Sequence, residues 1–143
     1  MQKAESWHNR PYHNLGCSYQ SMLAAQVAEV FHRLPPADQA RACVFGQNYG
    51  EAGAINYYGR HLGLPRAIST HNSYWLWGPQ GCDGAVTLVI GGDEDDNRDH
   101  CVGLERGGTV HNDWARPDEN DLPIWICRGQ RIPIDELWKL ARH

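Results

Sequence analysis

The spacing of apolar side chains divides the chain into short helices and short strands. In Ser18–Leu34, apolar residues recur every three or four positions, which is the period of one apolar helix face. Pro35 and Pro36 follow directly and end the predicted helix. Ala42–Phe45 is instead a short, continuous apolar run between breakers, which is typical of a strand buried on both faces.

The same pattern continues to the C-terminus, where Ala85–Ile90 is the clearest strand and Gly91 and Gly92 close it. The remaining predicted elements are a helical turn at Ala37–Arg41, a helix at Ala54–His61, a short strand at Ala67–Ser69, a polar helix or long turn at Asp93–Val102, a weak strand at Thr109–His111, a strand at Ile124–Cys127 and a helix at Pro133–Ala141. His71–Gly81 is predicted to be an aromatic loop.

Helices that alternate with short apolar strands predict an α/β fold. We expect a layered sandwich with a mostly parallel sheet of about four or five strands, flanked by helices. No repeat or linker interrupts the pattern. The predicted organisation is an irregular N-terminal arm over residues 1–17 and a single α/β domain over residues 18–143.

Length and charge narrow the class of protein. A chain of 143 residues can bury a real core but is too short for two ordinary domains. The net charge of −4 argues against a nucleic-acid binder, because phosphate contacts need clustered basic side chains. No apolar stretch approaches the roughly 18–20 residues that cross a bilayer, and Met1–Arg10 has no apolar signal-peptide core. A free-standing chain of this kind is expected in the cytoplasm.

The five cysteines predict reduced thiols. They are Cys17, Cys43, Cys82, Cys101 and Cys127, and no two have the spacing of a zinc ribbon or a thioredoxin motif. Their number is odd and no export signal is visible, which favours the reduced state. Cys43 and Cys127 lie in apolar runs and are predicted to be small core residues.

Two unusual segments follow predicted strands, Gly46–Gly53 and Thr70–Gly78. Ligands of open α/β sheets bind beyond the carboxyl ends of the strands, so the two segments would share one rim if their strands are neighbours. Glu51 in the first segment either places a charge at a helix N-terminus or accepts hydrogen bonds from sugar hydroxyls.

The second segment is rich in aromatic residues, with Tyr74, Trp75 and Trp77 close together. Such side chains suit sugar stacking or a protein interface, and equally a cap on the end of the sheet. His71 with Glu51 or Asp113 would supply an acid and a base, although nothing in the sequence specifies such a pair. No cofactor motif or metal-ligand spacing is present, so neither group is expected.

Several stretches of the chain together carry a family resemblance. They are Asn48–Ile55, Tyr58-Gly59, Gly63–Pro65, Ser69–Pro79, Glu119-Asn120, Leu122–Ile124 and Cys127–Gly129. The sequence resembles the C-terminal soluble domain of bacterial glycosyltransferase family 39-like proteins, which are membrane proteins similar to dolichyl-phosphate-mannose protein mannosyltransferases. The similarity extends from Gln20 to Trp138. Thr70 departs from the family, which commonly has glycine there, and His111–Trp114 replaces a stretch that often contains cysteine.

The resemblance implies a supporting role. In the family, this module follows a multi-helix membrane portion that holds the polyprenyl-phosphate sugar donor and the catalytic carboxylate, and it faces the extracytoplasmic, periplasmic side. No catalytic residue is therefore carried over to this chain. The residues expected to line a recognition surface are Asn48, Tyr49, Glu51, His71, Asn72, Tyr74, Trp75 and Trp77.

Three functions follow from these observations. The first is a non-catalytic accessory or binding domain that contacts a glycan, a lipid-linked (polyprenyl-phosphate) sugar or an acceptor, with a membrane transferase domain as its partner. The second is a small free-standing enzyme that uses His71 with Glu51 or Asp113. The third is a purely structural interaction domain that buries Trp75 and Trp77 against a partner.

Overall fold

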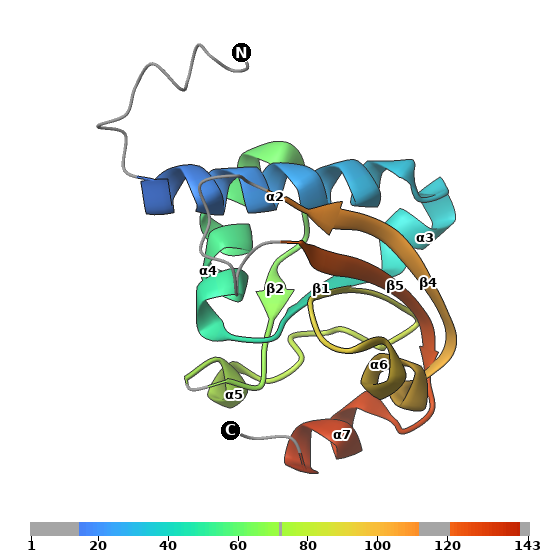
Figure 1. The fold of residues 1–143 in the computed structure, drawn as a ribbon. Helices are drawn as coiled ribbons and strands as arrows, with labels where there is room; N and C mark the ends of the chain where they lie inside the picture. Colours follow the sequence, from blue (N-terminus) through green and yellow to red (C-terminus); the bar gives the residue numbers. More distant parts are fainter. Residues whose placement is uncertain (1–14, 72, 112–120, 141–143) are drawn as a thin grey trace.

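The strands of the protein form one mixed sheet (Figure 1). The computed structural model of the chain describes residues 15–71, 73–111 and 121–140 and places five strands in the order β2-β1-β3-β5-β4. The strands are β1 Ala42–Gly46, β2 Ala67–Ile68, β3 Val86–Ile90, β4 Cys101–Val110 and β5 Leu122–Gln130. The helices are α2 Leu15–Arg33, α3 Pro36–Arg41, α4 Tyr49–Tyr58, the 3₁₀ helix η1 Gly59–Leu62, α5 Ser73–Trp77, α6 Glu94–His100 and α7 Ile134–Leu140. The predicted α/β class and strand number are confirmed.

The prediction of a mostly parallel sheet is wrong. β1 pairs in parallel with both β2 and β3, whereas β5 runs antiparallel to both β3 and β4. The longest pairing joins β4 and β5, from Cys101 opposite Gln130 to Val110 opposite Leu122. Consecutive strands that pair as a hairpin are antiparallel. The prediction failed because β4 was expected only as a weak strand at its C-terminal end.

Glycines conceal β4 in the sequence, and the structure explains one of them. A Cβ atom on Gly107 would lie 2.7 Å from Cγ1 of Val30 and 2.9 Å from Cδ1 of Ile126. The glycine therefore permits α2 to cross close over the strand, and it does not end the strand. The β4–β5 register also shifts between Arg106 and Gly108, as at a β-bulge.

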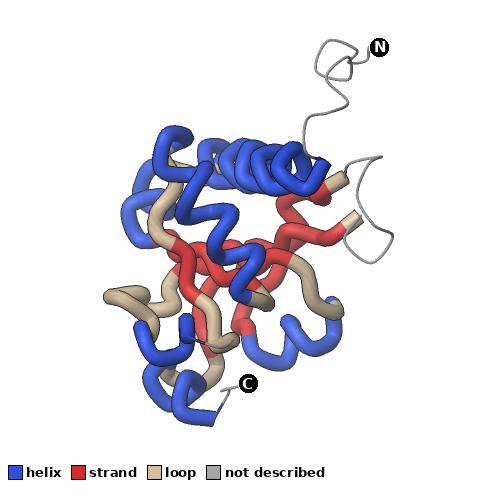
Figure 2. Tube along the Cα trace, turned by 90° about the vertical axis from the view of Figure 1, so that its left-hand side faces the viewer, coloured by secondary structure: helices blue, strands red, loops and turns tan. Residues whose placement is uncertain are grey.

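The first face of the sheet carries the main core. Helices lie on both sides of the strands, and α2 and α4 cover this face (Figures 1 and 2). Leu23 and Val27 of α2 and Ile55 of α4 are fully buried there. They pack against side chains of the central strands, Val44, Leu88, Ile90, Ile124 and Ile126.

The second face is smaller and is cross-linked by two disulfides. Cys43 of β1 bonds to Cys82, and Cys101 at the start of β4 bonds to Cys127 of β5. The expectation of reduced thiols is therefore wrong for these four cysteines, although Cys43 and Cys127 are buried as predicted. Spacing along the chain could not reveal the bonds, because the partners are 39 and 26 residues apart and meet only across the sheet.

Three element boundaries also differ from the prediction. α2 begins at Leu15, so the end of the predicted irregular arm is helical; residues 1–14 lie outside the described part of the chain. α4 begins at Tyr49 instead of Ala54, because Asn48 supplies an N-cap. Ser73–Trp77 forms the short helix α5 within the segment predicted to be a loop.

Candidate functional site

The two segments that the sequence singled out lie at the same edge of the sheet. β1 and β2 are parallel neighbours, with Phe45 opposite Ile68, so both chains leave the sheet at their carboxyl ends. β3 is also parallel to β1 and ends at the same edge, with Ile90 opposite Gly46. The prediction of a shared rim is confirmed for the backbone, and this edge is where parallel sheets bind ligands.

Asn48 and Glu51 build the start of α4. The Asn48 side chain accepts a hydrogen bond from the Glu51 backbone N–H at 2.9 Å, and Oε1 of Glu51 accepts one from the Gln47 backbone N–H at 2.9 Å. This reciprocal arrangement resembles a capping box, which satisfies backbone donors left over at a helix start. The Glu51 carboxylate is therefore engaged in structure. Tyr49 is the first residue of α4.

The aromatic helix α5 packs against α4 through Tyr74. The Asn56 side chain donates a hydrogen bond to the Tyr74 hydroxyl at 3.0 Å, and its own carbonyl oxygen accepts one from the Ala67 backbone N–H at 2.8 Å. The Tyr74 and Trp77 rings make an edge-to-face contact, with 4.7 Å between the ring centroids. Because Trp77 is 55% exposed, this pair presents an aromatic surface to solvent.

Trp75 has a different environment from its neighbours. Its indole N–H donates to the backbone carbonyl of Trp138 at 2.7 Å, and the Trp138 indole N–H donates to the backbone carbonyl of Trp75 at 3.0 Å. This reciprocal pair joins α5 to α7. Trp75 thus makes a structural contact, whereas Tyr74 and Trp77 form the exposed aromatic surface.

Of His71, Asn72 and Asp113, only His71 belongs to the residues that the structure describes. His71 is half-buried, and its backbone carbonyl accepts a hydrogen bond from the Tyr74 backbone N–H at the start of α5. Asn72 and Asp113 lie outside the described residues. The pairing of His71 with Glu51 or Asp113 as acid and base stays a prediction.

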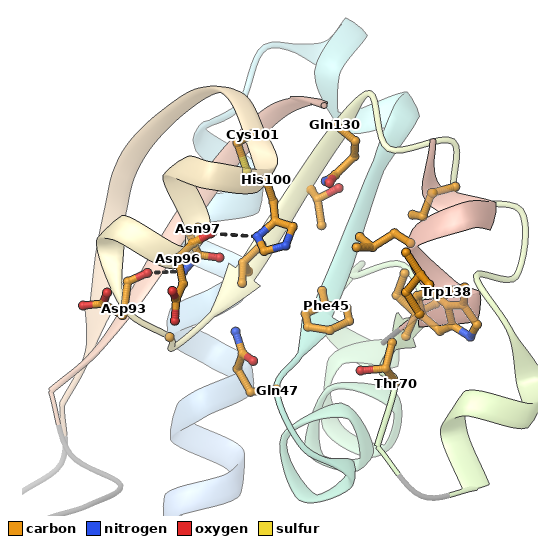
Figure 3. Close-up of a pocket in the computed structure, with 17 residues that line it drawn as sticks. Phe45, Gln47, Thr70, Asp93, Asp96, Asn97, His100, Cys101, Gln130 and Trp138 are labelled. Atoms are coloured by element: carbon orange, nitrogen blue, oxygen red, sulfur yellow. Dashed lines mark hydrogen bonds between the residues drawn. The ribbon is translucent and has the colours of Figure 1, made fainter. Parts of the chain in front are cut away.

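A pocket of about 420 Å³ opens on the second face of the sheet, beside the same edge (Figure 3). Phe45 lies at its centre between His100 of α6 and Trp138 of α7. The lining residues that lie within or just beyond the parallel strands are Phe45, Gln47, Ile68, Thr70, Thr87, Val89 and Gly92. The volume is within the usual range for small-molecule sites.

The two helices give the pocket walls of opposite character. α7 contributes apolar side chains, Ile134, Leu137, Trp138 and Leu140. α6 and the residue before it contribute polar ones, Asp93, Asp96, Asn97 and His100. This polar wall is ordered by local hydrogen bonds, from the Asn97 amide to the Asp93 carbonyl at 3.0 Å and between His100 Nδ1 and the Asp96 carbonyl at 2.7 Å.

Thr87 is the unusual group in the pocket lining. The residue is only 3% exposed, and its hydroxyl oxygen has no hydrogen-bond partner among the described residues. Its neighbours across the sheet are Cys43 and Cys127, and both sulfurs are held in disulfides. Buried hydroxyls without partners are rare in folded proteins.

The charged groups whose pKa values are shifted are not among the residues that line this pocket. The pKa of Asp83 is below its ordinary value because its carboxylate accepts a hydrogen bond from the Ala85 backbone N–H and pairs with Arg41. The pKa of Arg128 is raised, first by its hydrogen bond to Asp38 and also by Glu105. Over residues 15–71, 73–111 and 121–140, no group of three or more acidic, histidine or cysteine side chains is placed to hold a metal ion.

Sequence reasoning found the correct edge of the sheet but not the pocket. None of the eight predicted residues is among the described side chains that line it, although Gln47 and Thr70, which belong to the two predicted segments, do line it. One signal was available, since Thr87 is the single polar residue in the apolar run Val86–Ile90. That Thr87 lines a pocket became visible only once α6 and α7 were placed.

Comparison with known protein families, curated proteins and solved structures finds no match for this chain. The resemblance to the glycosyltransferase family 39-like domain therefore stays a prediction. No helix within the described part of the chain is both long and apolar enough to cross a membrane.

Proposed function

We propose that the chain is a non-catalytic binding domain that contacts a glycan, a lipid-linked sugar or a glycan acceptor at the edge formed by α4 and α5. The observation that carries this proposal is the Tyr74–Trp77 pair, in which the Trp77 indole is largely exposed and packs edge-to-face on Tyr74, whose hydroxyl is held by Asn56 of α4. Aromatic faces held in a fixed orientation suit the apolar faces of sugar rings. The family resemblance points to the same class of ligand.

The engagement of Glu51 favours binding over catalysis. A general acid or base must exchange its proton with substrate, whereas this carboxylate accepts a hydrogen bond from the backbone N–H of Gln47, just before α4. The free-standing enzyme with His71 is therefore the weaker alternative. A pH–rate profile on glycosides or sugar esters distinguishes the two, since the proposal expects no turnover.

The two disulfides support an oxidising, extracytoplasmic location for the domain. Disulfides persist on the exported side of the membrane and are rare in the reducing cytosol. This is also the side on which the resemblance places such a module, next to a membrane transferase domain. The cytoplasmic location expected of a free-standing chain is less compatible with the two bonds.

A titration with mannose oligosaccharides tests the binding function. Tryptophan fluorescence and amide NMR shifts of the full chain are followed, and Trp77→Ala is expected to weaken binding at least about fivefold, as for an exposed aromatic anchor. Leu76→Ala is the matched control, because Leu76 is 68% exposed beside Trp77 but has no ring. Equal effects of the two variants, or no saccharide-dependent shift around α5, would contradict the proposal.

A further inference from the structure

We propose that the pocket between α6, α7 and the second face of the sheet binds an uncharged small molecule with an apolar body and one hydroxyl or carbonyl group. This site is separate from the aromatic surface on α5 and goes beyond the proposed glycan-binding function. Its residues come from the five strands, from positions just after β1, β2 and β3, and from α6 and α7, and the Tyr74–Trp77 pair does not line it.

The unpartnered hydroxyl of Thr87 is the reason to expect a polar group on the ligand. A buried hydroxyl that lacks a partner costs free energy, and valine would fill the same strand position without that cost. The residues beside Thr87 on both neighbouring strands are disulfide cysteines, so they bring no strong donor or acceptor to it. The hydroxyl oxygen is covered in this structure, so a bound molecule reaches it once the Thr87 side chain turns toward the pocket. A hydroxyl or carbonyl group on that molecule would then supply the missing hydrogen bond, because a threonine hydroxyl both donates and accepts.

The apolar surfaces of the pocket define the body of the ligand. Phe45, Ile68 and Val89 line it from the sheet, and α7 adds a wall of apolar side chains. A volume of about 420 Å³ accommodates a ring system or a short branched chain. Apolar lining with a few polar groups is the usual composition of a small-molecule site.

The charges at the pocket exclude an anionic ligand. Asp93 and Asp96 line the α6 side, and neither lysine nor arginine is among the described side chains of the lining. A carboxylate or phosphate would be repelled by the two aspartates and would find no lysine or arginine partner there. The pocket is thus poorly suited to the phosphate of a polyprenyl-phosphate sugar, which further separates this site from the proposed recognition surface.

The test uses three probes of similar size: benzyl alcohol, toluene and benzoate. Methyl and amide NMR shifts of the full chain are followed during titration with each. Benzyl alcohol and toluene are expected to shift the resonances of Phe45, Val89 and Leu137, and benzoate is expected to bind more weakly than benzyl alcohol. If none of the three shifts these resonances, or if benzoate binds more tightly than benzyl alcohol, the proposal is overturned without any variant.

Thr87→Val then isolates the hydroxyl. It is expected to weaken benzyl alcohol binding about threefold to tenfold, which is the range for one hydrogen bond, and to leave toluene binding unchanged. Thr87→Ser keeps the hydroxyl and should retain the wild-type ratio of the two affinities. Thr109→Val makes the same chemical change on exposed β4, outside the pocket. Parallel changes in both affinities, or none in either, would refute the assignment of Thr87, whatever the outcome of the saccharide titration.

Discussion

The two disulfides should supply a large share of the stability of this domain. One bond links Cys43 to Cys82 and the other links Cys101 to Cys127, and all four side chains are buried on the second face of the sheet. The perturbation is reduction of the native chain with dithiothreitol. The genetic counterpart replaces each bonded pair by two alanines.

The expected loss in the free energy of unfolding follows from the length of chain that each disulfide closes into a loop. The partners of Cys101–Cys127 are 26 residues apart and those of Cys43–Cys82 are 39 apart. Chain entropy then gives about 3.5 and about 3.9 kcal/mol for the two bonds at 25 °C. Their combined effect, about 7 kcal/mol, is comparable to the whole free energy of unfolding of an ordinary domain, which is about 5–15 kcal/mol.

Urea unfolding followed by tryptophan fluorescence measures the loss. With a slope of about 2 kcal/mol per molar urea, loss of one bond should lower the midpoint by about 1.5–2 M. Alkylation in denaturant without reductant should label at most one cysteine per chain, and all five after reduction. Because a Cys→Ala pair also leaves a small cavity, the doubly reduced wild type is the control that separates the cross-link from packing. Three or more labelled cysteines before reduction, or a midpoint insensitive to dithiothreitol, would refute the reasoning.

Three further predictions concern single contacts. Asn48→Ala removes the N-cap of α4 and should lower the free energy of unfolding by about 1 kcal/mol, measured by urea unfolding, whereas Glu51→Gln, which keeps an acceptor, should cost less. Trp75→Phe removes the indole hydrogen bond to the Trp138 carbonyl and should cost about 1 kcal/mol, seen as a thermal midpoint lowered by about 3–4 °C. Asp83→Asn should lower stability slightly at pH about 6 and converge with wild type near pH 2. The backbone N–H of Ala85 and the Arg41 side chain lower the pKa of this carboxyl in the folded chain. The charged carboxylate therefore stabilises the fold above the ordinary pKa of about 3.9, and this stabilisation is lost as the pH falls through the lowered pKa of the folded chain.

The hydrophobic pattern was sufficient for elements whose side chains face the main core. β1, β3 and α2 were predicted within a few residues, because Val44, Leu88 and Val27 lie in runs or periods set by that core. It failed for β4, an edge strand whose residues are mostly exposed or half-buried and whose Gly107 is required by the close approach of Val30. Without β4, the antiparallel half of the sheet could not be predicted.

The candidate site, like the fold, was predictable from the sequence only in part. Consecutive strand–helix units imply a shared edge, so the meeting of the segments around Asn48 and Tyr74 was predictable from the order of elements. The roles within that edge were not, since they depend on tertiary partners. Glu51 accepts a backbone N–H of its own helix start, and the indoles of Trp75 and Trp138 meet although 63 residues separate them.

The Cys101–Cys127 disulfide anchors the polar wall of the pocket. α6 has no buried residue, so it cannot hold its place by an apolar face as α2 does. It is attached at its C-terminal end, where Cys101 lines the pocket and is bonded to Cys127 of β5, and by a hydrogen bond from the Arg131 backbone N–H to the His100 carbonyl. Reduction should therefore loosen the polar wall of the pocket before it affects the core under α2 and α4. We therefore expect the pocket to be best ordered where the cysteines stay oxidised, which connects the proposed small-molecule site to the proposed extracytoplasmic location.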